Sequence, residues 1–288
     1  GGRRLGHVEG GRHALSELLV QRGVALEVCI TSNMLIKSTE YLRYGGPPVR
    51  LLLEQGVKVV LCSDDPGMWG DAEGTCMHRE CERALEAGVT REQLGECMAT
   101  AFDVSKAAPA DVRAQLAAEA RAWAASGKGT DALPKADLHM HINGSVPKWW
   151  MDKVSKEKDK EYPAPLPDDP AAGGKVYADL DDFRVDYDAR GAVIKAAGQD
   201  SVPDQIVAIA ADCAKHNVRL IEMSVTPTGD WDQFFAWCAE ARKQAFEQHQ
   251  VYVSYVVTAV RTLSLDFKGL PAQKMLDFSL KYGACVAA

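Results

Sequence analysis

The chain has 288 residues and a formal net charge of −7, with 47% hydrophobic and 25% charged residues. These proportions are those of an ordinary soluble globular protein, and the acidic balance argues against a nucleic-acid backbone as a partner. No apolar run approaches the roughly 18 residues of a membrane-spanning helix, and no signal peptide is visible. We therefore expect a cytoplasmic protein with no membrane partner. The length fits two domains or one large α/β barrel.

The eight cysteines form no CxxC pair and no regular framework. This pattern favours buried free thiols in a reducing compartment over disulfides or a thiolate zinc site. The first residue is not methionine, which suggests a fragment or a processed chain.

Strands and helices alternate along the first part of the chain. The strand candidates there are rich in β-branched residues, and the helix candidates carry capping or helix-stop signals at their ends. In chain order we predict a strand at Arg4–Val8, a helix at Arg12–Arg22, a strand at Val24–Ile30 ending in the polar turn Thr31-Ser32-Asn33, a helix at Pro47–Gln55, a strand at Val57–Cys62, and helices at Thr75–Glu86, Thr90–Phe102 and Asp111–Ala125.

The same alternation resumes after a small, polar stretch, SGKGTD, within residues 126–132, which we interpret as an exposed linker. The predicted elements that follow are a strand at Lys135–His141, an irregular insert at Lys153–Lys175, a helix at Val202–His216, a strand at Val218–Val225, a helix at Trp231–Gln248, a strand at Val251–Val260, a helix at Pro271–Tyr282 and a strand at Cys285–Ala288.

Alternating strands and helices predict an α/β fold with a parallel sheet, of the TIM (β/α)₈ type. Only seven strands are counted, whereas a closed barrel of this type needs eight. We expect residues 1–125 and 133–288, joined by the linker, to form one barrel domain together.

Candidate metal ligands stand at the ends of three predicted strands. His139 and His141 project to the same side because side chains alternate along a strand. Asp64 and Asp65 follow a buried strand and His7 follows a short one, where a barrel presents its catalytic groups. Singly, an HxH is often two unrelated histidines and an Asp-Asp-Pro is often a turn. Together they favour a metal site, and imidazole with carboxylate suits Zn²⁺, although other first-row metals fit as well.

These motifs resemble those of a known family. The stretch LPKADLHMHINGS at 133–145 is similar to the opening of the adenosine deaminase family. The stretches RLGH at 4–7, LEVCITSN at 26–33 and SDDP at 63–66 resemble later strands of that family, in family order. The family is a metal-dependent TIM barrel that removes the amino group from adenine nucleosides. The resemblance thus implies zinc-dependent hydrolytic deamination, which converts adenosine to inosine and ammonia.

The resemblance also implies a role for each matching residue. His139, His141 and Asp64 would be the Zn²⁺ ligands, and His7 would act beside the metal as base or electrostatic stabiliser. Asp65 would be catalytic and would also contact the purine, while Asn143 and Gly144 would bind the substrate, Gly144 by letting the backbone approach it.

The order of the motifs departs from that family. The HxH segment comes first in the family but follows the Asp-Asp motif here, which predicts a circular permutation, a read across tandem copies or a misassembled gene. The family motif His-Ala-Gly-Glu, which supplies another zinc ligand and a ring-protonating glutamate, occurs nowhere in the sequence. We therefore expect a barrel that lacks one strand, self-association through the open sheet edges, and weak or no activity.

Several alternatives stay open at this point. Asn143 stands where many adenosine deaminases have aspartate, which resembles the branch that acts on N6-substituted AMP. The partner would then be a purine nucleotide in place of a nucleoside. A catalytically inactive relative is a second alternative, and a TatD-like metal-dependent hydrolase is a third.

Overall fold

The computed structural model describes residues 4–5, 13–36, 47–69, 77–165, 176–227, 229–258 and 281. Within these ranges the chain alternates short strands with helices, as the sequence predicted. The strands are β1 (Arg4–Leu5), β2 (Ala25–Val28), β3 (Lys58–Leu61), β4 (Lys135–His141), β5 (Val218–Val225) and β6 (Tyr252–Val257). The longer helices are α1 (His13–Arg22), α5 (Met77–Glu86), α6 (Arg91–Val104), α7 (Ala110–Trp123), α9 (Lys148–Lys158), α10 (Leu180–Ala197), α11 (Val202–Lys215) and α12 (Trp231–His249). The short helical turns are α2 (Ile30–Leu35), α4 (Val49–Glu54), η1 (Pro66–Met68), η2 (Ala124–Ser126), η3 (Thr130–Ala132), α8 (Ile142–Ser145) and η5 (Gln199–Ser201).

All described strand pairs are parallel. One sheet has the order β1-β2-β3 and the other has the order β4-β5-β6. A single parallel bridge between Asp64 and Met140 joins the sheets, so the end of β3 lies beside β4. The strand that carries the HxH motif is therefore next to the strand that leads to Asp64, although some seventy residues separate them in sequence.

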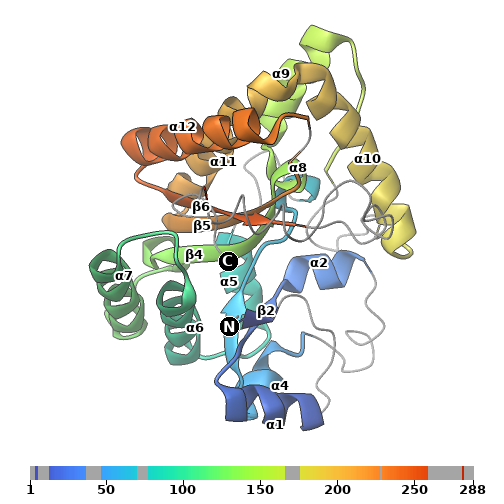
Figure 1. Cartoon of the computed structure of the whole chain (residues 1–288). Coiled ribbons are helices and arrows are strands. Elements are labelled where there is room, and N and C mark those ends of the chain that lie inside the picture. The colour runs from blue at the N-terminus through green and yellow to red at the C-terminus, as the bar shows by residue number, and fades with distance from the viewer. Residues whose placement is uncertain are drawn as a thin grey trace.

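The helices cover the outside of these strands (Figure 1). Helices α11 and α12 lie against the β4–β6 sheet, while α6 packs on α7 and contacts both β3 and β4. Buried residues from both halves form one large apolar core, which includes Leu61, Phe102, Leu138, Ile221 and Phe235. The two halves thus form one packed unit.

Local signals explain several element boundaries. Helix α6 begins at a capping box, in which the Thr90 hydroxyl accepts from the Gln93 backbone N–H and the Gln93 side chain accepts from the Thr90 N–H. Aspartates 179 and 230 cap α10 and α12 through side-chain hydrogen bonds to backbone N–H groups. The helix predicted at Thr90–Phe102 is thus found, at Arg91–Val104.

Other expectations were wrong or fall outside the described residues. The predicted polar turn Thr31-Ser32-Asn33 is part of helix α2, and its first two residues are buried. The expected irregular insert begins within helix α9, and helix α10 was not predicted. The predicted strand Cys285–Ala288 lies outside the described residues. The six described strands form two joined sheets and do not close a barrel among themselves.

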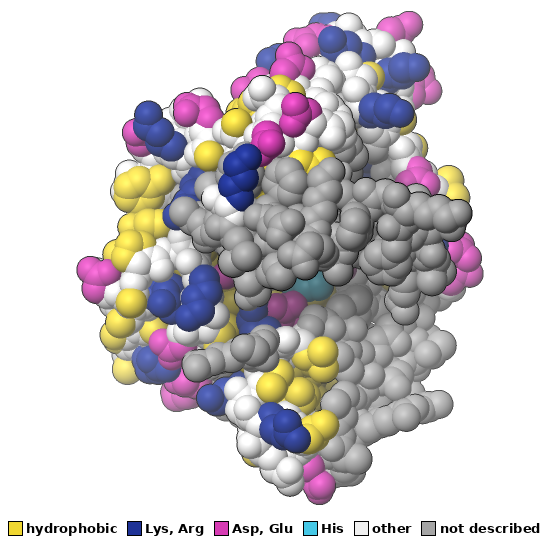
Figure 2. Space-filling model, in the orientation of Figure 1, with side chains coloured by type: hydrophobic (Ala, Val, Ile, Leu, Met, Phe, Trp, Pro, Cys, Tyr) yellow, Lys and Arg dark blue, Asp and Glu magenta, His cyan; other side chains and the backbone are white. Residues whose placement is uncertain are grey.

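The described surface shows no strong charge segregation on the face in Figure 2, where basic and acidic side chains are interspersed. A histidine side chain is visible at the bottom of a hollow near the centre of this face, next to acidic side chains. Among the described residues, no helix has both the length and the apolar character needed to cross a bilayer.

Candidate metal centre

Asp64 is held at the end of β3 in an unusual backbone conformation. Its φ of 65° lies in the left-handed region, which non-glycine residues seldom adopt and which aspartate tolerates better than most. Two backbone hydrogen bonds fix it there, from Asp64 N–H to His139 O (2.8 Å) and from His141 N–H to Asp64 O (2.9 Å). Such strain persists only where the surrounding structure imposes it, and it is concentrated at functional sites. The same bonds place the Asp64 side chain over the HxH motif.

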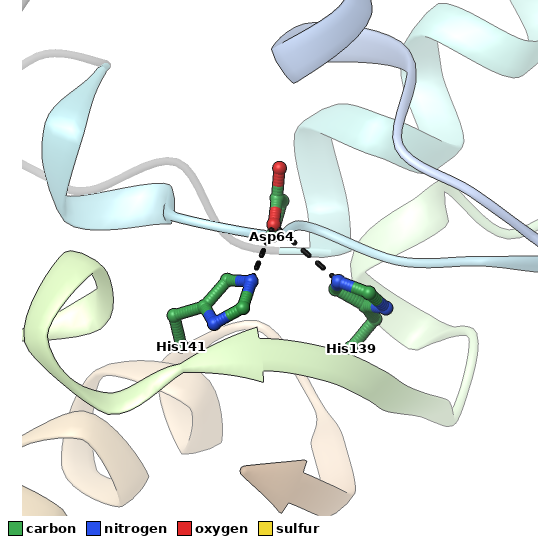
Figure 3. A group of neighbouring side chains, drawn as sticks. All are labelled: Asp64, His139 and His141. Carbon is green, nitrogen blue, oxygen red and sulfur yellow. Dashed lines mark ion pairs between the residues drawn. The ribbon is translucent and has the colours of Figure 1, made fainter. Parts of the chain in front are cut away.

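The three predicted metal ligands lie together (Figure 3). The Asp64 Oδ1 is 3.2 Å from His141 Nε2 and 3.6 Å from His139 Nε2. Both histidines project from β4 toward Asp64, and their rings meet at 80° with centroids 5.3 Å apart. One ligand atom from each residue lies within 4.8 Å of the others, so modest side-chain adjustments would bring all three onto one ion.

A buried carboxylate orients the first of these histidines. Glu27 on β2 is 7% exposed, and its Oε2 is 2.8 Å from His139 Nδ1. A carboxylate on Nδ1 keeps the proton there and leaves Nε2 free to bind a metal, the usual arrangement around a metal-binding imidazole. Glu27 is itself paired with Arg4, whose Nε lies 3.4 Å from Oε1. The sequence analysis missed Glu27, although a charged residue inside the apolar strand ALEV is a signal of such a role.

Asp65 lies buried beside the backbone of the HxH segment. Its carboxylate packs against Gly144, where a Cβ atom would overlap the Asp65 side chain. The Asp65 carboxylate can approach this closely only because residue 144 is a glycine. The Asp65 Oδ1 is buried without a hydrogen-bond partner. An unpaired buried acceptor is costly.

The charges of this centre are strongly coupled. Burial and the neighbouring Asp64 raise the pKa of Asp65 to about 7. Burial lowers the pKa of His141, but the Asp65 and Asp64 carboxylates outweigh it and raise that pKa to about 9. Burial also lowers the pKa of His139, but the hydrogen bond to Glu27 raises it, and the resulting pKa lies above the usual value. The carboxylates of Glu27, Asp64 and Asp65 lie around the two imidazoles and attract positive charge, as a cation site requires.

The remaining predicted site residues are placed differently. Asn143 lines a pocket of about 470 Å³ together with His141, Tyr187, Lys195 and Gln199. This pocket opens directly beside the candidate ligands, so Asn143 can contact a bound molecule. His7 lies outside the described residues.

A buried arginine next to Asp65 was also not predicted. Arg190 on α10 is 1% exposed, and its Nη2 donates to Val146 O at 2.8 Å. Its Nε and Nη1 have no hydrogen-bond partner. No sequence signal pointed to Arg190, because helix α10 was not recognised.

Comparisons with known proteins match the first part of the chain. A family model described as adenosine deaminase matches residues 2–123, a stretch that includes Glu27, Asp64 and Asp65 and ends before β4. The chain is similar to an adenine deaminase of Rhodospirillum rubrum, with 34% identity over 108 residues, or 36% of this chain and 31% of the relative. It is also 28% identical over 109 residues to an adenosine deaminase of Escherichia coli, covering 36% of this chain and 31% of that protein. An adenosine deaminase of Salmonella newport is 30% identical over 118 residues, which are 40% of this chain and 33% of the relative.

The matched stretch spans about a third of the length of these curated relatives. It carries the buried strands and the Asp-Asp motif that form one side of the candidate metal centre. Residues 2–123 of the chain thus match the adenosine deaminase family.

Proposed function

We propose that this chain carries a zinc-dependent site for the hydrolytic deamination of an adenine nucleoside or nucleotide. The observation that carries the proposal is the convergence of Asp64, from the family-matched half, with His139 and His141 from the other half. Neither half contains the three ligands alone.

The side chains fit a divalent metal. They offer two imidazole nitrogens and a carboxylate oxygen, a donor set suited to Zn²⁺. Glu27 orients His139 through its hydrogen bond, and the raised pKa of His141 supports a site that favours positive charge next to its ring. A divalent cation held here would supply Lewis acidity and a nucleophile derived from water at neutral pH.

The chain's own groups would position the substrate. The free Oδ1 of Asp65 can accept a hydrogen bond from the purine or from the attacking water, and Asn143 can donate to a polar group in the adjoining pocket. We propose His7 as the group beside the reacting centre, on its sequence motif alone. In the reaction, water adds to the carbon that bears the amine, and ammonia leaves.

We further propose that the strands belong to a TIM-like barrel in permuted order. Six parallel strands in the order β1 to β6, with β3 bridged to β4, support this proposal. Arg4 on β1 reaches Glu222 on β5 at 2.6 Å, a contact expected across the inside of a curved sheet.

The experiment is deamination by the purified chain loaded with Zn²⁺, followed as loss of adenosine. Since the His-Ala-Gly-Glu motif does not occur in the sequence, we expect a rate about 10²–10⁴-fold below that of a complete enzyme, the usual contribution of a general acid. The residual activity should disappear after chelation and in His141→Ala. Equal zinc content in the wild type and in His141→Ala would remove this residue from the ligand set.

A nucleotide substrate is the second candidate, and Lys195 favours it. This lysine lines the pocket that contains His141 and Asn143, and its ammonium can neutralise a phosphate. We expect N6-substituted AMP or AMP to be used better than adenosine, and Lys195→Gln to remove that preference without affecting adenosine. A preference for adenosine in both proteins would exclude the nucleotide.

A further inference from the structure

A second group of metal-ligating side chains lies away from the candidate centre. His78 on α5, Asp131 on η3 and His216 between α11 and β5 each offer one ligand atom, and these atoms all lie within 4.8 Å of one another. The cluster joins three segments that are far apart in sequence, and two of them flank the start of β4 and β5. The first centre, in contrast, stands at the end of β4.

The two ring nitrogens of His78 have different surroundings. Its Nδ1 is 3.2 Å from Asp131 Oδ1, and its Nε2 is 3.3 Å from Glu82 Oε1. A metal-binding imidazole normally donates its second N–H to a carboxylate, which fixes the tautomer. Glu82 occupies that position, so Nδ1 of His78 can face an ion that Asp131 shares.

The second imidazole lies close to the first. The His216 ring is stacked on that of His78, with centroids 5.3 Å apart and planes 22° apart. Two imidazoles at this distance can each present one nitrogen to the same ion.

Hydrogen bonds from Lys135 hold the backbone segments that carry Asp131 and His216. The ammonium of Lys135 is fully buried and donates to the carbonyls of Thr130 (2.6 Å), Leu133 (3.0 Å) and His216 (2.8 Å). It therefore fixes the approach of η3 to the residue before β5. Its positive charge opposes a cation, and the carboxylates of Asp131 and Glu82 offset that charge.

We propose that His78, Asp131 and His216 form a second divalent-metal site that holds the 126–132 linker against α5 and the start of β5. Two imidazoles and one carboxylate suit Zn²⁺, with water completing the coordination. The Thr130 hydroxyl, now 3.3 Å from His78 Nδ1, turns away when the ion binds. Because Asp131 is the linker's contribution, an ion here holds residues 126–132 against α5 and the start of β5.

The first test is the zinc content of the full chain after equilibrium dialysis. Asp131→Asn and His216→Asn should each bind one equivalent of Zn²⁺ less than the wild type. The Asp131 side chain is 76% exposed, so its substitution leaves folding unaffected. His249→Asn and Glu119→Gln, which alter residues outside the cluster, should retain the wild-type zinc content. Glu82→Gln should weaken zinc binding by about 10–100-fold, as loss of a supporting carboxylate does.

The second test uses the linker itself. Lys128 is exposed and is the only lysine or arginine within 126–132, so trypsin cleaves the linker after it. Zn²⁺ should slow this cleavage in the wild type and in His141→Ala, and should not slow it in Asp131→Asn. Equal zinc content in the wild type, Asp131→Asn and His216→Asn would overturn the proposal, as would zinc protection that persists in Asp131→Asn. Neither outcome depends on deaminase activity.

Discussion

At the scale of single residues, the candidate centre is organised by buried charges inside apolar strands. Glu27 on β2 aligns His139, and Glu222 on β5 receives Arg4 together with the Ser105 hydroxyl (2.5 Å) and the Lys106 N–H (3.1 Å). A buried carboxylate is stable only when its oxygens are paired, so each such residue marks a contact that the fold must make.

Glu27→Gln should weaken zinc binding at the candidate centre. The amide removes the charge that keeps the proton on Nδ1 of His139, and loss of such a partner costs about 10–100-fold in metal affinity. Competition with a chelator of known affinity measures the change. Glu17→Gln, an exposed change on α1, serves as the control. Unchanged affinity in Glu27→Gln would mean that Glu27 does not support the ligand.

Gly144→Ala should damage the centre by a steric route. The new Cβ atom would occupy the position of the Asp65 carboxylate, so the side chain or the backbone must shift. We expect a loss of about 1–3 kcal/mol in the free energy of unfolding, as for other overpacked sites, together with loss of deamination. Gly129→Ala, whose new Cβ meets no atom within 4 Å and which does not line the pocket, is the matched control. Wild-type activity in Gly144→Ala would refute the packing argument.

At the scale of elements, the carboxylate of Glu80 links helix α5 to the segment that follows strand β2. Glu80 on α5 is buried and accepts hydrogen bonds from the N–H groups of Ile30 (2.7 Å) and Thr31 (3.1 Å) at the start of α2. These donors have no partner within their own short helix. The contact explains why LEVCITSN changes from strand to helix, a boundary that the sequence placed wrongly.

Glu80 should make stability depend on pH. Burial raises the pKa of Glu80 from 4.5 to about 7, against the opposite effect of its hydrogen bonds. The folded state then binds more protons than the unfolded state between these two values, so stability falls as pH rises through that window. The fall attributable to Glu80 is at most about 3 kcal/mol. Urea unfolding of the wild type and of Glu80→Gln on either side of the window measures it, with exposed Glu86→Gln as the control. An equal slope in Glu80→Gln and the wild type would contradict this assignment.

At the scale of the whole molecule, a shared apolar core and specific backbone and ion-pair contacts join the two halves of the chain. The bridge from Asp64 to Met140 links the sheets, and the Arg4–Glu222 pair links β1 to β5. The Glu222 side chain is 1% exposed, so its charge is compensated almost wholly by Arg4, Ser105 and Lys106.

Glu222→Ala should destabilise the chain strongly. Removing one partner of a buried pair typically costs about 3–5 kcal/mol, because the other charge is left buried. Chemical unfolding of the full chain measures the loss. Glu96→Ala, which breaks an exposed pair with Arg121, should cost no more than about 1 kcal/mol. Similar losses in the two variants would show that Glu222 does not join the halves.

The sequence by itself determined most of the strands and helices and the choice of candidate ligands. Alternating apolar strands and amphipathic helices predicted the parallel α/β organisation, and the spacing of His139 and His141 predicted their common direction, because side-chain periodicity is a local property. The helices α9 and α10 escaped prediction, since prolines and charges near them obscured the periodic pattern.

Only the tertiary structure decided what surrounds these ligands. The left-handed backbone at Asp64 depends on hydrogen bonds to β4, and the closeness of Gly144 to Asp65 depends on the packing of the two halves. Glu27, Arg190 and the cluster of His78, Asp131 and His216 are likewise brought into place by contacts between distant segments. Such contacts leave no periodic trace in a single sequence, because each depends on where another part of the chain folds.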